Sequence, residues 1–157
     1  ALVEPEIIRA LYKASSAGVM VDLIVRGICC LCPGIPEVSD NIRVRSIVGR
    51  FLEHSRIYYF YANGAAELFC SSADWMDRNI FRRIEITYPI LDAASKARLI
   101  DDLELYLRDN SKAWQLLPNG SYRRVSPKAG ERLLSAQDSL LDKLAQNIGE
   151  SPRLDMH

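Results

Sequence analysis

The side chains best suited to chemistry lie in segment 44–56, where His54 and Arg56 stand two residues apart just before an apolar, aromatic-rich run. If a strand begins at that run, both side chains emerge on one face of a sheet, because successive side chains of a strand alternate between its faces. Imidazole exchanges a proton near pH 7, whereas a guanidinium group stays charged and fits phosphate oxygens with two donors. The pair therefore favours phosphate chemistry, but a histidine near aromatic residues is more often structural, and His-x-Arg alone is a weak motif.

Two serines follow the next apolar run, 66–70. We expect Ser71 and Ser72 at the end of the returning strand, close to the point where His54 enters the first strand. Hydroxyl groups and free backbone N–H groups at such a place suit phosphate oxygens. The alternative is a helix cap, in which Ser72 or Asp74 begins a helical turn.

Arginine is unevenly distributed along the chain. Residues 14–95 contain no lysine but have eight arginines, at positions 26, 43, 45, 50, 56, 78, 82 and 83. Arg26 follows the apolar run 19–25 and is expected at the carboxyl end of a strand, the usual ligand-binding end of an open α/β sheet. Arg45 and Arg50 are weaker candidates for phosphate contacts. The alternative is that these arginines solvate the surface or pair with neighbouring acids.

The cysteines do not form a metal-binding pattern. They are Cys29, Cys30, Cys32 and Cys70, and the chain has only two histidines, His54 and His157. A zinc site requires spaced cysteine pairs with matching partners, so no metal site is expected. We interpret the cysteines as small buried apolar residues at a strand end, in a reducing cytoplasm.

The hydropathy pattern and turn residues predict alternating helices and strands in one domain. The expected elements are a helix from Glu4 to Gly18, strands at 19–25 and 42–48, a hairpin of 56–62 and 66–70 around Asn63-Gly64, a strand at 83–87 stopped by Pro89, a helix from Asp92 to about Leu107, a hairpin within 114–125, a helix at 133–148 and a frayed tail from Gly149. A helix that leads into an apolar strand is typical of an α/β unit with parallel pairing.

Length and charge set only broad limits. The 157 residues fit one domain, and the formal net charge of zero argues neither for nor against a polyanionic partner. No run approaches the roughly 18 apolar residues of a spanning helix, so no transmembrane segment is expected. A basic stretch followed by an apolar one is absent from the first residues, so no signal peptide is expected.

The order of these motifs resembles a known superfamily. His54-Ser-Arg56 and the later Ser71-Ser72 with Asn79 are similar to the phospholipase D signature, in which His-x-Lys precedes a strand and Gly-Ser-x-x-Asn follows the next. Here arginine replaces the lysine and serine the glycine, which argues against simple phospholipase or nuclease activity.

A more specific resemblance is to the C-terminal domain of the polyphosphate kinase family. Segments 22–30, 41–56 and 71–79 resemble that domain nearly residue for residue, and the resemblance covers roughly residues 1–124. One departure is Cys32, which stands where arginine is expected. The resemblance implies an α/β fold: a phospholipase-D-like mixed β-sheet flanked by helices, with a C-terminal helical segment. It divides the chain into a domain at 1–125, truncated at its N-terminal side, and a helix and tail at 126–157.

The resemblance also implies a function. Such an enzyme moves the terminal phosphate of ATP reversibly onto inorganic polyphosphate through a phosphohistidine in the preceding half, and Mg²⁺ arrives with the nucleotide. Arg26 and His54 would contact the nucleotide phosphates, with His54 as the catalytic residue, and Arg56, Ser71 and Ser72 would add phosphate contacts. The expected partners are ATP or ADP, polyphosphate, the upstream domains of the same polypeptide and further copies of the full-length chain, with no nucleic acid.

The resemblance places the protein in the cytoplasm or peripherally at the inner membrane, and it predicts that the fragment alone is inactive. Two alternatives stay open at this point. One is a phosphodiesterase built from paired copies of the domain, and the other is a non-catalytic module that binds polyanions.

Overall fold

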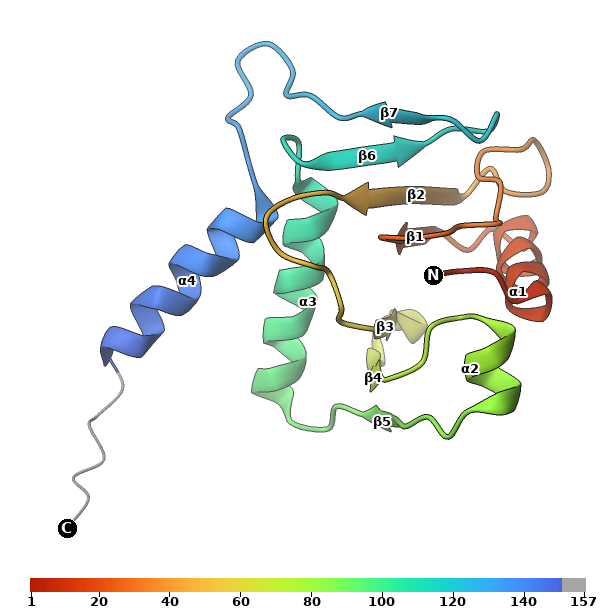
Figure 1. The fold of residues 1–157 in the computed structure, drawn as a ribbon, viewed down its shortest axis with the longest axis horizontal. Coiled ribbons are helices and arrows are strands. Elements are labelled where there is room, and N and C mark those ends of the chain that lie inside the picture. Colours follow the sequence, from red (N-terminus) through yellow and green to blue (C-terminus); the bar gives the residue numbers. More distant parts are fainter. Residues whose placement is uncertain (151–157) are drawn as a thin grey trace.

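The structure, a computed structural model, describes residues 1–150 (Figure 1). In chain order the elements are α1 (Pro5–Ser16), β1 (Val21–Ile24), β2 (Ile42–Ile47), β3 (Ile57–Phe60), the 3-10 turn η1 (Ala62–Gly64), β4 (Glu67–Ser71), α2 (Asp77–Arg82), β5 (Thr87–Pro89), α3 (Ala93–Arg108), β6 (Ala113–Leu116), β7 (Tyr122–Arg124) and α4 (Ala136–Glu150). The predicted tail lies outside the described residues from position 151 onward. Within residues 1–150, no helix is long and apolar enough to cross a membrane.

The strands form two sheets. One has four strands in the order β1-β2-β6-β7, and the other has three in the order β3-β4-β5. β1 and β2 are parallel, as predicted, and the remaining pairs are antiparallel. The mixed α/β class is therefore confirmed, with its strands divided between two sheets. Figure 1 shows α3 running alongside both sheets, from the level of β2 to that of β5.

Local signals explain where two of the predicted helices, α1 and α3, begin. The Glu4 side chain accepts a hydrogen bond from the Ile7 amide at 2.7 Å, and Pro5 opens α1 with its fixed backbone angle. The Asp92 carboxylate caps α3 in the same way, accepting from the Ser95 amide at 2.7 Å. The apolar side of α1 packs on a core cluster of Leu2, Val25, Leu31, Ile42, Val44 and Leu116.

Both predicted hairpins are confirmed. β3 pairs antiparallel with β4, and between them Asn63 and Gly64 adopt φ values of 53° and 93°. This left-handed conformation is easiest for glycine and asparagine, so the Asn-Gly pair fits the turn. β6 pairs with β7 around Gly120, which has φ of 80°.

The strand predicted at 83–87 is wrong in position. Segment 77–82 forms α2, where the sequence suggested only a possible helix cap at Ser72 or Asp74, and the β5 ladder begins at Thr87. Ile84 is fully exposed and Ile86 is 66% exposed, so their alternation marks no buried face. Pro89 ends β5 on an exposed edge, where its missing N–H costs nothing.

The cysteines are also less buried than predicted. Cys30 and Cys32 are exposed, Cys29 and Cys70 are partly buried, and all four are free. Leu31, 1% exposed, takes the core position in that segment instead. Burial raises the pKa of the Cys29 and Cys70 thiols, which keeps them protonated and weakly nucleophilic.

A buried carboxylate attaches α4 to the rest of the fold. Asp109, 1% exposed, follows α3 and accepts hydrogen bonds from four backbone amides: Ser111, Lys112 and Ala113 at 2.7–3.1 Å, and Ala136 at 2.7 Å. Asn110 adds a further link, since its side chain and backbone bond Leu134. The first turn of α4 is therefore held firmly against the corner between α3 and β6.

Candidate functional site

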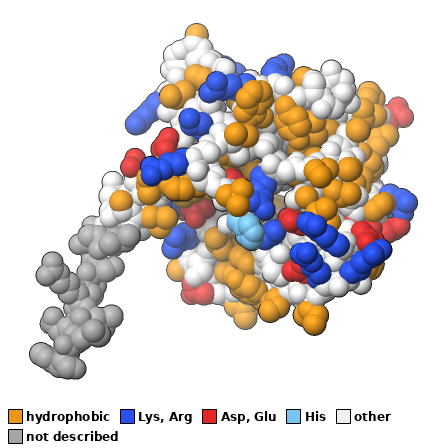
Figure 2. All heavy atoms as spheres, viewed as in Figure 1, with side chains coloured by type: hydrophobic (Ala, Val, Ile, Leu, Met, Phe, Trp, Pro, Cys, Tyr) orange, Lys and Arg blue, Asp and Glu red, His pale blue; other side chains and the backbone are white. Residues whose placement is uncertain are grey.

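A cleft of about 480 Å³ lies between the two sheets, bounded on one side by α3. Its lining comes from the end of β1 (22–26), the start of β3 (56–59), segment 73–75 and α3 (100–107). Arg26, His54 and Arg56, three of the predicted site residues, all line it. Figure 2 shows histidine and Lys or Arg side chains gathered near the centre of the face in view.

His54 and Arg56 are in direct contact. β3 begins at Ile57, so both residues belong to the loop between β2 and β3 rather than to the strand itself. The Arg56 Nη1 atom lies 3.2 Å from His54 Nδ1 and 3.5 Å from Nε2, and it donates to the His54 carbonyl at 3.3 Å. The arginine therefore faces the imidazole ring of an exposed histidine.

Arg56 is also paired with an acid. Its Nε and Nη2 atoms reach the two Asp74 carboxylate oxygens at 3.2 and 3.0 Å, an arrangement with two parallel hydrogen bonds. Both side chains are largely buried, with 16% and 17% exposed. The Arg56 guanidinium is the main cause that lowers the pKa of Asp74 from its ordinary value of 3.8 to about 2, against the opposing effect of burial. Two of the Arg56 donor atoms are thus committed to Asp74, and Nη1 faces His54.

This ion pair predicts an acid-dependent loss of stability. The folded-state pKa of Asp74 is lower than its ordinary value, so the pair contributes fully above about pH 5 and is lost as the pH falls toward 2. The shift corresponds to about 2 kcal/mol, of which about 1 kcal/mol is lost by pH 3. We expect urea unfolding at pH 7 and pH 3 to show this extra loss for the wild type relative to Asp74→Asn. Asp77→Asn, in the exposed pair with Arg82, is the control. An equal pH response of wild type and Asp74→Asn would contradict the prediction.

Arg26 is placed differently. It lies two residues beyond the end of β1, partly buried, at the carboxyl end of that strand as predicted. Among residues 1–146, whose side chains the structure describes, no acid forms an ion pair with Arg26, in contrast to the alternative in which a neighbouring carboxylate holds it. Its donors are therefore available to an anion in the cleft.

The predicted serines do not line the cleft. Ser71 Oγ lies 2.8 Å from Thr87 Oγ1 and accepts from the Ala73 amide at 3.1 Å. Ser72 Oγ donates to Glu85 and accepts from the Ile86 amide at 3.0 Å. Both hydroxyl groups thus join the end of β4 to β5 and the segment before it.

The two weaker arginine candidates also lie outside the cleft lining. Arg45 donates to the Tyr106 carbonyl at 3.2 Å, near the end of α3, and burial lowers the pKa of its guanidinium. Arg50 lies over the Phe51 ring, 5.3 Å from its centroid. The structure therefore brings together Arg26, His54 and Arg56, but not Ser71, Ser72, Arg45 and Arg50.

Sequence reasoning missed several residues of the cleft. Tyr58 and Trp75 stack at 5.0 Å with ring planes 12° apart, and the Tyr58 hydroxyl donates to the Ala73 carbonyl at 3.1 Å. Burial raises the pKa of Tyr58, so it stays neutral. Glu53 also lines the cleft beside His54. Glu53, Tyr58 and Trp75 belong to no motif with a recognisable spacing. Only their closeness in sequence to His54 or to Ser71 and Ser72 could have indicated that they line the cleft.

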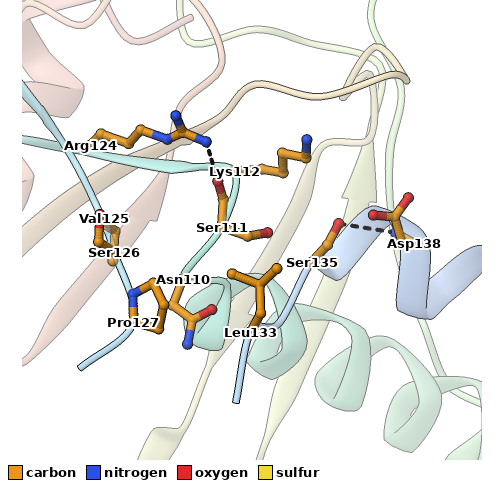
Figure 3. Close-up of a pocket in the computed structure, with 10 residues that line it drawn as sticks. All are labelled: Asn110, Ser111, Lys112, Arg124, Val125, Ser126, Pro127, Leu133, Ser135 and Asp138. Carbon is orange, nitrogen blue, oxygen red and sulfur yellow. Dashed lines mark hydrogen bonds between the residues drawn. The ribbon is translucent and has the colours of Figure 1, made fainter. Parts of the chain in front are cut away.

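A second hollow of about 300 Å³ lies between the start of β6, segment 124–127 and the start of α4 (Figure 3). Lys112, Arg124 and Asp138 are among the residues that line it, and Arg124 donates to the Ser111 carbonyl at 3.1 Å. It shares no lining residue with the cleft between the sheets. His54 therefore lines only the larger of these two hollows.

The fold and the cleft define a class: a mixed α/β domain that presents an imidazole and two guanidinium groups to one cavity, a set suited to phosphoryl groups. The family model "Polyphosphate kinase C-terminal domain 2" matches residues 1–137. The chain therefore belongs to the polyphosphate kinase family and corresponds to this C-terminal domain.

Individual relatives agree with the family match. The chain is 59% identical over 144 residues to the polyphosphate kinase of Burkholderia lata and 55% identical over 147 residues to that of Pseudomonas aeruginosa, which covers 91% and 94% of the chain. The crystal structure of polyphosphate kinase from Porphyromonas gingivalis matches with a TM-score of 0.89 and 43% identity over 96% of the chain, and confirms the phospholipase-D-like architecture. The chain spans only 21% of either relative and 23% of the crystallised chain.

Proposed function

We propose that this chain supplies half of the active site of an enzyme that transfers the terminal phosphate of ATP reversibly to inorganic polyphosphate. The observation that carries the proposal is the cleft in which Arg26, with its donors free, lies with the His54–Arg56 pair. Phosphoryl transfer needs positioning and charge stabilisation more than covalent chemistry from the protein, and these three side chains offer both.

Each of the three residues has a distinct role in this proposal. Arg26 holds the nucleotide phosphates with two parallel donors, because its guanidinium is not committed to an acid of the described chain. His54 is exposed and acts on the transferred group from the side opposite the phosphohistidine of the preceding half. Arg56, held by Asp74, fixes the orientation of the imidazole and adds positive charge beside it.

Magnesium enters as part of the nucleotide substrate. Among the side chains described in residues 1–146, no group of three His, Cys, Asp or Glu residues is placed to hold a metal ion. Mg²⁺ typically keeps several waters and binds through substrate phosphates and one or two carboxylates. The donor set of this chain therefore suits Mg²⁺ carried by ATP or ADP rather than a separate protein site.

The remaining partners follow from the length and surface of the chain. Large apolar side chains are exposed on the three-stranded sheet and its flanking segments: Phe60, Tyr61, Phe81, Ile84, Ile86, Tyr88 and Leu91. Exposed apolar groups in such number mark an interaction surface. Since the relatives are about five times longer, we assign this surface to the upstream domains of the same polypeptide. We further propose that the full-length enzyme forms a homo-oligomer in the cytoplasm, or peripherally at the inner membrane.

Radiolabelled ATP tests the division of the active site. We expect the isolated chain to take up no acid-labile label from ATP labelled in its terminal phosphate, because the acceptor histidine lies in the preceding half. The full-length protein, or the chain supplemented with the upstream domains, should be labelled and should form polyphosphate. Stoichiometric acid-labile label on His54 of the isolated chain, or a full-length protein that forms no polyphosphate, would contradict this assignment.

A further inference from the structure

The loop that carries His54 is attached to α4 by a single side chain. This loop, residues 48–56, connects β2 to β3. Gln137, in the first turn of α4 and 5% exposed, accepts a hydrogen bond from the Phe51 amide at 3.0 Å and donates to the Phe51 carbonyl at 2.8 Å. Its amide therefore pairs with both backbone groups of one loop residue, as a neighbouring strand would.

The same glutamine also holds the residue next to His54. Gln137 Nε2 donates to Glu53 Oε1 at 2.5 Å, and the Tyr106 hydroxyl of α3 donates to Glu53 Oε2 at 2.8 Å. Burial, reinforced by Glu53, raises the pKa of Tyr106, so its hydroxyl remains a donor at any working pH. Two helices thus fix the Glu53 carboxylate, and Arg56 fixes the His54 carbonyl from the other side.

Close packing at Gly49 points to the same contact. A Cβ atom at position 49 would lie 2.3 Å from Gln137 Oε1 and 2.9 Å from its Cδ. Gly49 does not have a positive φ, so a larger residue there would be opposed by the end of the Gln137 side chain rather than by backbone conformation. The helix cannot shift away easily, because the neighbouring Ala136 amide is bound to the buried Asp109 carboxylate. The loop and the first turn of α4 are therefore fitted to each other closely.

We propose that Gln137 is a positioning residue that holds the loop 48–56 so that His54 faces the cleft and Arg56. The inference rests on the proposed function, since it assigns Gln137 to the reaction in which His54 acts. A glutamine is suited to this task because its side-chain amide carries both a hydrogen-bond donor and an acceptor. It accepts from the Phe51 amide and donates to the Phe51 carbonyl and to Glu53. The first turn of α4 accordingly belongs to the catalytic unit, although it lies more than 80 residues from His54 in sequence.

The most informative variant is Gln137→Glu in the full-length protein. It keeps the shape and the acceptor for the Phe51 amide, loses the donor, and brings a second carboxylate against Glu53. We expect kcat to fall about tenfold with KM for ATP nearly unchanged, because Arg26 still binds nucleotide while His54 is displaced. Hydrogen exchange should quicken at the amides of 51–55. Gln146→Glu, an exposed change on the same helix, is the matched control and should alter neither quantity.

Two further variants keep the proposal testable if that protein folds poorly. Gly49→Ala adds one methyl group to the contact and should lower kcat and quicken exchange in the same direction. Combining Gln137→Glu with Glu53→Gln exchanges donor and acceptor across the pair, and we expect it to recover much of the lost kcat. If Gln137 had a structural role alone, these variants would lower the melting temperature but would keep normal turnover per folded molecule. The double variant would then show no recovery of kcat.

The outcomes separate this inference from the proposed function. If Gln137→Glu and Gly49→Ala match Gln146→Glu in kcat and in loop exchange while His54→Ala is inactive, the positioning role is overturned and the function stands. If His54→Ala is fully active, the role of His54 in the proposed function fails. The positioning inference then fails with it, even where faster exchange shows that Gln137 holds the loop.

Discussion

Replacing His54 with alanine in the full-length protein is expected to lower ATP-dependent polyphosphate synthesis by about 10²- to 10⁴-fold, the usual contribution of a histidine in general acid–base catalysis. The folded protein should be nearly unaffected. His54 is exposed, and among the described side chains it contacts Arg56, which Asp74 already holds. Substitutions at such surface positions usually change stability by less than about 0.5 kcal/mol.

The measurement pairs turnover with stability. Polyphosphate formation and thermal unfolding are recorded on the same preparation of wild type and His54→Ala, with Ser55→Ala as the control on the same exposed loop. A well-folded His54→Ala protein with normal synthesis would remove His54 from the mechanism. Arg26 and Arg56 would then form a phosphate-binding surface only. A large fall in melting temperature with normal turnover per folded molecule would instead make His54 a packing residue.

The sequence predicted best those elements that local interactions define. α1 and α3 begin at acidic caps three residues from the amides they bind, and both hairpins turn at an Asn-Gly pair. Such signals lie within a few residues, so a pattern search captures them. Parallel pairing was likewise expected from the helix that leads into the first strand, and the structure places it between β1 and β2.

The errors arose where a partner far along the chain decides the structure. Segment 83–87 has the alternating pattern of a strand, but the residues that pair with β4 are Thr87–Pro89. Ile84 and Ile86 therefore lie before the strand and are exposed to solvent. The cysteines share a segment with Leu31, and only the packing of the core determines which side chain is buried there. The division of the strands between two sheets likewise depends on contacts that no periodicity encodes.

The site shows the same limit. His54, Arg56 and Arg26 were predicted from residue type and from their position beside strands, and the fold brings them to one cleft. The groups that support His54 were missed because they are remote. Asp74 lies 18 residues from Arg56, and Tyr106 and Gln137 lie 53 and 84 residues from Glu53. The grouping of these three side chains could therefore be predicted from the sequence, but not the contacts that hold the loop of His54, and phosphate chemistry in this cleft stays a prediction.

Substitution of Arg26 tests the proposed binding of the nucleotide phosphates. Arg26→Lys in the full-length protein preserves the charge but removes the planar pair of donors, so we expect kcat/KM for ATP to fall about tenfold. Arg26→Ala also removes the charge and should lower kcat/KM about 100-fold, in line with the roughly 1.5–3 kcal/mol of a hydrogen bond to a charged group. Both variants should fold normally, because Arg26 forms no ion pair with the side chains described in residues 1–146 that its loss would break.

Arg43→Lys provides the matched control for Arg26→Lys. Arg43 is an exposed arginine on β2 that pairs with Asp22 and is absent from the cleft lining, so the same change should leave kcat/KM for ATP unaltered. If Arg26→Lys equals the wild type while Arg26→Ala is impaired, Arg26 acts through charge alone and its two-donor contact with phosphate is wrong. If Arg26→Ala also equals the wild type, the nucleotide phosphates do not reach the carboxyl end of β1. Their binding would then fall to Arg56 and to residues of the upstream half.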